Sequence, residues 1–87
     1  MVESIRRLAA KIAARAQHKI AYRKMCRMLR EMREEASLTQ RELAEKVKMH
    51  PSMVHRSEIG DRRIDPVEFA NWCRACDRDP GAQIRLL

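Results

Sequence analysis

The sequence predicts an all-α fold, because residues that break helices occur at only a few well-spaced positions. Glycine is confined to Gly60 and Gly81, and no proline precedes Pro51. Pro51, Pro66 and Pro80 each stand where a helix would begin, and proline suits the first helical position because the N–H that it lacks would have no partner there. The alternation of apolar and polar residues that would indicate strands is missing throughout.

The chain has room for one small domain with a modest core. Its 87 residues include only three aromatic side chains, so the packing must rest on Leu, Ile, Val, Ala and Met. No apolar run approaches the ~20 residues of a membrane span, and the N-terminus lacks the continuous apolar block of a secretory signal. We therefore expect a cytoplasmic protein that makes no use of a membrane.

Positive charge is concentrated at the N-terminal end. The whole chain has 19 Lys and Arg against 12 Asp and Glu, a net charge of +7. Residues 1–24 hold seven of the basic residues and a single acidic one, Glu3, so the rest of the chain is close to neutral. A basic chain suggests a polyanionic partner such as nucleic acid, whereas the simpler interpretation is a solvated helix face. The sequence leaves both open.

Two helical patterns occupy the first 36 residues. Residues 3–18 carry an apolar stripe of Ile5, Leu8, Ile12 and Ala16, and residues 22–36 carry a second stripe. At ~100° per residue the stripes point about 140° apart, so one straight helix cannot bury both against the same core. Either the helix breaks near residues 17–20, or it continues and its first half faces something else, such as a second subunit. We divide the chain into a basic amphipathic N-terminal helix, residues 1–20, and a domain, residues 21–87.

Four further helices are predicted downstream, over residues 40–47, 51–58, 66–77 and 80–86. Thr39 followed by Glu42 forms a capping box that begins the first of them, and Asp65 followed by Glu68 begins the third in the same way. Asp79 is the matching N-cap of the last helix. Together with residues 22–36, these segments make a five-helix domain that follows the additional N-terminal amphipathic helix.

The stretch from Thr39 to Gly60 has apolar and small residues where two short helices need them to pack on a third. Ala44 stands where the helices cross closest, and the four sites that must be apolar hold Leu43, Val47, Met49 and Val54. With the opening Leu38-Thr39-Gln40, the segment resembles the helix-turn-helix of the phage repressor and Cro class, also called Xre-like regulators. The resemblance covers roughly residues 22–86 and implies a DNA-binding domain.

The resemblance also implies which residues would meet double-stranded DNA. In this architecture the second helix of the pair lies in the major groove, while the first crosses the backbone. The base-contacting positions correspond to Pro51, Ser52, His55 and Arg56, and the phosphate-contacting positions to Gln40, Arg62 and Arg63. Arg56 is the sharpest candidate, because a guanidinium can bind guanine O6 and N7 bidentately.

The sequence departs from the family pattern at the turn and at the end of the second helix. Lys48 occupies the turn site that usually holds glycine, at a cost of about 1 kcal/mol if the turn needs a positive φ. Ser57 stands where the family buries an aliphatic side chain, and Ile59 stands where it usually exposes arginine. Either Ile59 turns inward to fill the space, or it stays exposed and marks a protein contact.

Cys73 and Cys76 form a Cys-x-x-Cys pair that could suggest redox or zinc chemistry. The redox motif needs a helix that begins at its first cysteine, whereas this pair falls inside the helix predicted over residues 66–77. The inward-facing residues of that helix are predicted to be Val67, Phe69, Ala70, Cys73 and Cys76. No second Cys-x-x-Cys or paired histidine joins Cys26 to make a zinc site. We expect no metal, no cofactor and no enzymatic activity.

The expected function is a sequence-specific double-stranded DNA-binding transcriptional regulator, a repressor that acts as a homodimer on a palindromic operator. The alternative is a protein-binding module, such as an antitoxin or anti-activator, that uses the fold or the N-terminal helix to hold a partner protein. An exposed Ile59 and the apolar stripe on residues 5–16 would favour that alternative. The dimer would be held by the N-terminal helix or by the C-terminal helix, which carries Ile84, Leu86 and Leu87.

Overall fold

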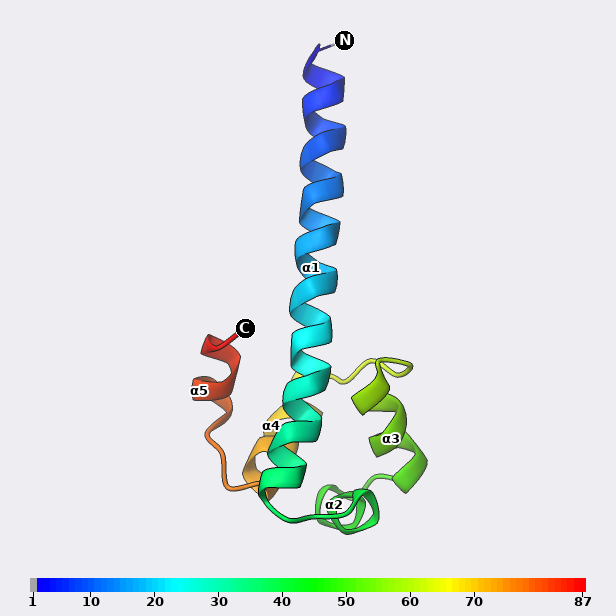
Figure 1. The fold of residues 1–87 in the computed structure, drawn as a ribbon, viewed down its shortest axis with the longest axis vertical. Coiled ribbons are helices and arrows are strands. Elements are labelled where there is room, and N and C mark those ends of the chain that lie inside the picture. Colours follow the sequence, from blue (N-terminus) through cyan, green and yellow to red (C-terminus); the bar gives the residue numbers. More distant parts are fainter. Residues whose placement is uncertain (1) are drawn as a thin grey trace.

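The computed structural model describes residues 2–87, and all regular structure within them is helical. The helices are α1 (Val2–Glu35), α2 (Gln40–Val47), α3 (Pro51–Ile59), α4 (Pro66–Ala75) and α5 (Pro80–Arg85). Figure 1 shows α1 as one long rod, with the four shorter helices gathered around its C-terminal part and its N-terminal part extending away from them. The predicted all-α fold is confirmed.

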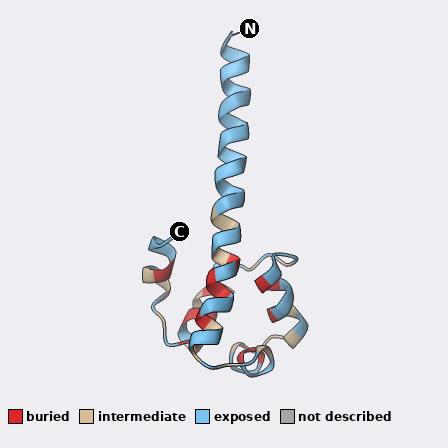
Figure 2. Ribbon diagram, viewed as in Figure 1, coloured by how far each residue is buried: buried red, intermediate tan, exposed pale blue. Residues whose placement is uncertain are grey.

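The first helix does not break near residues 17–20. It runs for 34 residues without interruption, so the additional N-terminal helix and the first helix of the domain are a single element. Its two apolar stripes have different environments. Leu29 and Met32 are buried in the core, whereas Ile5, Leu8 and Ile12 are 66%, 59% and 58% exposed. Figure 2 shows the same change along α1, from exposed at its start to buried near its end.

Trp72 is fully buried in the core. Its indole Nε1 donates a hydrogen bond to the carbonyl oxygen of Leu29 at 3.0 Å, which ties α4 to α1. The buried apolar residues clustered around it are Met28, Leu29, Met32, Leu43, Ala44, Val54, Phe69, Cys73 and Cys76. This cluster draws on α1, α2, α3 and α4, so it holds the shorter helices against the C-terminal part of α1.

The inward prediction for Val67 is wrong, because its side chain is 68% exposed. The buried residues of α4 are Phe69, Trp72 and Cys73, followed by Cys76 at its C-cap. Their spacing of i, i+3, i+4 and i+7 defines one helix face, and Val67, two residues before Phe69, points away from that face. Trp72, which the predicted stripe omits, is part of the buried face that Val67 does not join.

Two helices begin at the predicted capping boxes. At the start of α2, the Glu42 N–H donates to Thr39 Oγ1 and the Thr39 N–H donates to Glu42 Oε1, both at 3.0 Å. At the start of α4, the Glu68 N–H donates to Asp65 Oδ1 at 2.8 Å and the Asp65 N–H donates to Glu68 Oε1 at 3.0 Å. These local bonds satisfy amides that have no partner inside the helix, and they fix where each helix starts.

The fourth helix is shorter than predicted and ends at Ala75 instead of residue 77. Asp77 has a φ of 57°, a left-handed conformation that no α-helix can continue through. The Arg78 N–H closes the end of the helix by donating to the Cys73 carbonyl at 2.8 Å. None of the helices in residues 2–87, α1 included, combines the length and apolar character that crossing a bilayer requires.

Candidate nucleic-acid interface

The helix pair α2–α3 is held by the small and apolar residues that the sequence singled out. Leu43 and Val54 are completely buried, and Ala44 is 1% exposed. Val47 and Met49 are partly buried against the same core. Because this side of the pair packs inward, the opposite side of α3 faces solvent and can reach a ligand.

The start of α3 is held by His50, to which the sequence analysis gave no role. The Ser52 N–H donates to His50 Nδ1 at 3.1 Å, and Ser52 Oγ lies 2.7 Å from the same nitrogen. Pro51 is the first residue of the helix. Histidine is an uncommon N-cap, so residue preferences gave no reason to expect it there. The Ser52 hydroxyl is exposed, but it already has a hydrogen-bonding partner.

His55 and Arg56 are exposed on α3. Within residues 2–87, Arg56 takes part in none of the ion pairs. A guanidinium without a carboxylate partner keeps its full hydrogen-bonding capacity for an external acceptor. Arg56 is therefore the residue of α3 best suited to bind a ligand.

Glu58 joins three elements beneath this surface. Arg33 in α1 donates from Nε to Glu58 Oε2 at 2.6 Å and from Nη2 to Glu58 Oε1 at 3.0 Å, and Gln40 in α2 donates to the same Oε1 at 3.0 Å. The side chains of Arg33 and Glu58 are only 12% and 2% exposed. Hydrogen bonding to Glu58 raises the pKa of the Arg33 guanidinium. Glu58 is therefore held in a buried ion pair with Arg33.

Gln40, the first residue of α2, lies beside α3. Its side-chain nitrogen is 3.0 Å from Glu58 Oε1 and 3.4 Å from His55 Nδ1. The structure thus brings a predicted phosphate-contacting residue and a predicted base-contacting residue together on one surface. Free amides at the start of a helix, together with the helix dipole, favour an anion at this position.

The two arginines of the α3–α4 loop have different surroundings. Arg62 donates to both carboxylate oxygens of Glu68, at 3.3 and 2.7 Å, and this contact lowers the pKa of Glu68. Arg63 is exposed, and its guanidinium carbon lies 5.4 Å from the centre of the Tyr22 ring, within the range of a cation–π contact. Arg63 therefore keeps its charge available to an anion, whereas the charge of Arg62 is partly neutralised.

Known proteins share the fold that carries this surface. A family model described as a helix-turn-helix domain matches residues 25–87. A solved structure, an XRE-family like protein from Pseudomonas syringae pv. tomato str. DC3000, is similar to this chain at 34% sequence identity and a TM-score of 0.81, covering 85% of this chain and 90% of the other. The chain belongs to the Xre-like helix-turn-helix family. No curated protein matches it. The general role that follows from Xre-like membership is that of a DNA-binding regulator.

The likeness to the Xre-family protein also includes part of the N-terminal extension. The family segment, residues 25–87, ends at the C-terminus and is a smaller share of the chain than the 85% that the solved structure covers. The additional matched residues must therefore lie before residue 25. A portion of α1 ahead of the family segment thus has a counterpart in the other protein.

The turn between α2 and α3 has the backbone conformation that the Xre-like pattern implies. Lys48 adopts φ 56° and ψ 48°, the left-handed region that glycine occupies without strain. The Met49 N–H then donates to the Ala44 carbonyl at 2.9 Å, which closes the end of α2. Lys48 thus has a positive φ at the site where relatives usually carry a glycine.

The departure from the Xre-like pattern at the end of α3 is resolved in favour of an exposed Ile59. Its side chain is 56% exposed, so it does not fill the space beside Ser57. Ser57 is itself buried, and its hydroxyl donates to the Met53 carbonyl at 2.8 Å. Because the buried hydroxyl is satisfied within α3, serine is tolerated at a site where relatives bury an aliphatic side chain.

The three cysteines of this Xre-like chain lie in its interior. Cys26, Cys73 and Cys76 are free and buried. Burial raises the pKa of all three thiols, that of Cys73 to about 11. At neutral pH they are thiols and not reactive thiolates. Within residues 2–87 no group of three or more His, Cys, Asp or Glu side chains is arranged to hold a metal ion.

Proposed function

We propose that this protein is a sequence-specific regulator of transcription that inserts α3 into the major groove of double-stranded DNA. The observation that carries the proposal is an exposed Arg56, without an ion-pair partner in the described residues, on a helix held rigidly from behind. The hydrogen bonds of Glu58 to Arg33 and Gln40 fix α3 against α1 and α2. A rigid helix can place a guanidinium with the accuracy that bidentate recognition of guanine needs.

The other predicted contacts would position the domain and refine the base preference. Pro51, Ser52 and His55 would face base edges, with Ser52 permissive and Pro51 unable to donate. Gln40 and Arg63 would contact phosphates on either side of α3. Arg62 would add a weaker phosphate contact, because its ion pair with Glu68 partly neutralises its charge. Phosphate contacts set the orientation of the protein, and contacts to bases set the sequence that it prefers.

In this proposal the protein acts in the cytoplasm as a repressor and binds a palindromic operator as a homodimer. One domain covers one half-site, and two half-sites about 34 Å apart along the same face of DNA give a dimer useful specificity. Exposed apolar side chains that support a dimer lie at the C-terminal end, where Ile84 is 52% and Leu86 59% exposed. The upstream stripe of α1 offers a second apolar surface.

A second candidate is a protein-binding module such as an antitoxin or anti-activator. The exposed Ile59 favours it, because relatives usually place arginine at this position of the DNA-facing helix. The exposed Ile5, Leu8 and Ile12 favour it as well. In this candidate the family's DNA-binding surface would be used in part or not at all.

The deciding experiment replaces Arg56 by alanine. Binding is titrated against an operator selected from a random pool of duplexes and against a scrambled duplex. Arg56→Ala should weaken operator binding by about 1–3 kcal/mol and relax preference at one base pair per half-site, with little change on the scrambled duplex. As a control, Arg63→Ala should weaken binding to the operator and to the scrambled duplex by similar amounts. Equal losses on both duplexes for Arg56→Ala would refute base reading, and a wild type that selects no sequence would favour the protein-binding candidate.

A further inference from the structure

Basic residues recur at every fourth position along most of α1. They are Arg7, Lys11, Arg15, Lys19, Arg23 and Arg27, and all are exposed. Side chains four residues apart are neighbours on a helix, so these six form one continuous row about 30 Å long, named here the basic row. Like charges at this spacing destabilise a helix by about 0.2–0.5 kcal/mol for each pair. The stability of α1 therefore does not account for the basic row.

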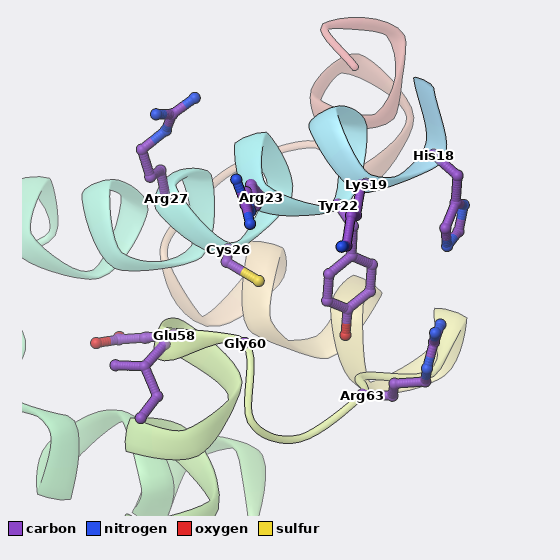
Figure 3. A pocket seen from close by; sticks show the side chains of 10 residues that line it. His18, Lys19, Tyr22, Arg23, Cys26, Arg27, Glu58, Gly60 and Arg63 are labelled. Atoms are coloured by element: carbon purple, nitrogen blue, oxygen red, sulfur yellow. The ribbon is translucent and has the colours of Figure 1, made fainter. Parts of the chain in front are cut away.

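The C-terminal half of the basic row lines a groove beside the DNA-facing helix. The groove has a volume of about 560 Å³, with Lys19 and Arg23 on its α1 side and Ile59 and Gly60, at the end of α3, on the other. Figure 3 shows Tyr22 pointing across the groove toward the loop that carries Arg63. A ligand lying in this groove would touch α1 and the end of α3 together.

The groove presents an uncompensated positive charge. Its one carboxylate, that of Glu58, is already hydrogen-bonded to Arg33 and Gln40. A second hollow, lined by Arg15, Lys19 and Arg63, continues along α1 from the same loop. The basic row is thus continuous with Arg63, the loop cation that is free to contact an anion.

We propose that Arg15, Lys19 and Arg23 of the basic row bind the phosphate backbone of DNA that continues beyond the half-site read by α3. This inference rests on the proposed function and deepens it, because α1 would lengthen the footprint of the domain. DNA is the favoured partner because a backbone passing the end of α3 meets the groove and then the row. A flat lipid surface cannot enter a groove walled by α3 and its loop, and a continuous row of like charges matches a polymer of phosphates.

The test compares two triple variants of the full chain that lose the same charge. One is Arg15→Gln/Lys19→Gln/Arg23→Gln, and the control is Arg6→Gln/Arg74→Gln/Arg85→Gln, three exposed cations outside the basic row. Affinity for a 30-base-pair duplex of arbitrary sequence, a length of about three helical turns, is measured over a range of salt concentrations. The slope of log K against log salt should flatten by ~0.9 for each lost contact, about 2.7 in all for the row variant. The slope of the control variant should change by less than ~0.9, the value for one contact.

Failure of this inference can be told apart from failure of the proposed function. The row variant should keep the wild-type ratio of operator to scrambled affinity, because phosphate contacts carry no sequence information. If the row and control variants have equal salt slopes while the wild type still prefers its operator, the proposed DNA contact of the basic row is overturned and the proposed function is not. A wild type that binds no duplex would overturn both. In a third outcome, the wild type binds vesicles of anionic lipid, and the row variant loses that binding while its DNA salt slope stays unchanged. That result would replace DNA by a membrane surface as the partner of the basic row.

Discussion

Arg33 and Glu58 form two parallel hydrogen bonds that link α1 to α3 across 25 positions of the sequence. Arg33 also donates from Nη1 to the Leu38 carbonyl at 2.9 Å, in the turn that leads to α2. One guanidinium therefore bonds to α3 and to the turn before α2. The pair sets the relative position of these elements, and with it the position of the candidate interface.

Replacing Arg33 by methionine should destabilise the fold by about 3–5 kcal/mol, because it leaves the buried Glu58 carboxylate without its charged partner. The matched control is Arg30→Met. Arg30 also lies in α1 and pairs with Glu34, but their side chains are 66% and 53% exposed, so the loss should stay below about 1 kcal/mol. Urea denaturation of both variants measures the difference. Similar losses would mean that the buried pair is no more important than the exposed one.

The Arg62–Glu68 contact should make stability depend on pH in the acid range. Hydrogen bonding to Arg62 lowers the pKa of Glu68 from its ordinary value of 4.5, so the stabilisation is complete above that value and is lost as pH falls through the lowered one. At pH 7, Glu68→Gln should cost roughly 1 kcal/mol, since the pair is only partly shielded. Urea denaturation at several pH values should show this cost shrinking below pH ~4.5. A cost that is undiminished at pH 3 would contradict the assignment. Glu45→Gln, at an exposed position of α2, is the control.

Replacing Lys48 by glycine should stabilise the protein by about 1 kcal/mol. Lys48 sits at φ 56°, where its Cβ is strained and glycine is not. Lys46→Gly, two residues earlier in the last turn of α2, should have the opposite sign and cost about 1 kcal/mol, because glycine weakens a helix interior. Thermal or urea denaturation of the two variants supplies the comparison. Loss of stability in both would show that the Lys48 side chain makes a contact that outweighs its backbone strain.

The protein should be a dimer at micromolar concentration, and two substitutions separate its candidate interfaces. Ile84→Asp places a charge on the exposed surface near the C-terminus, and Ile5→Asp places one on the upstream stripe of α1. The variant that disrupts the true interface should sediment as a monomer, since a buried unpaired carboxylate is costly. Val67→Asp, at a 68% exposed position of α4, is the control. A wild type that is monomeric both free and on DNA would refute the dimer.

Features with a local cause could be predicted from the sequence. The capping boxes of Thr39 with Glu42 and of Asp65 with Glu68 involve residues three positions apart, and the structure has both. The family pattern, which usually has glycine at the site of Lys48, raised the possibility of a left-handed turn there, and the structure has one. Each of these depends on a few neighbouring residues, whose preferences are the same in any fold.

Features that depend on distant residues could not be predicted in this way. Out-of-phase apolar stripes show that two faces differ in direction, but they do not show whether the helix between them breaks. Helix α1 continues because its first half contacts no core that would force a change of direction. Likewise, Arg62 and Arg63 are adjacent in the sequence. Only the fold determines that Arg62 bonds to Glu68 and that Arg63 lies over the ring of Tyr22.

The unbroken course of α1 makes chain length itself a constraint. One residue inserted or deleted between Ala16 and Tyr22 would turn everything upstream by about 100° relative to the core and move it by about 1.5 Å along the axis. A change of seven residues, nearly two full turns, would restore the direction to within about 20°. A substitution alters one side chain, whereas a single-codon insertion here would redirect the entire upstream half while the folded core stayed intact. The number of codons in this segment of the gene therefore also sets an angle in the protein.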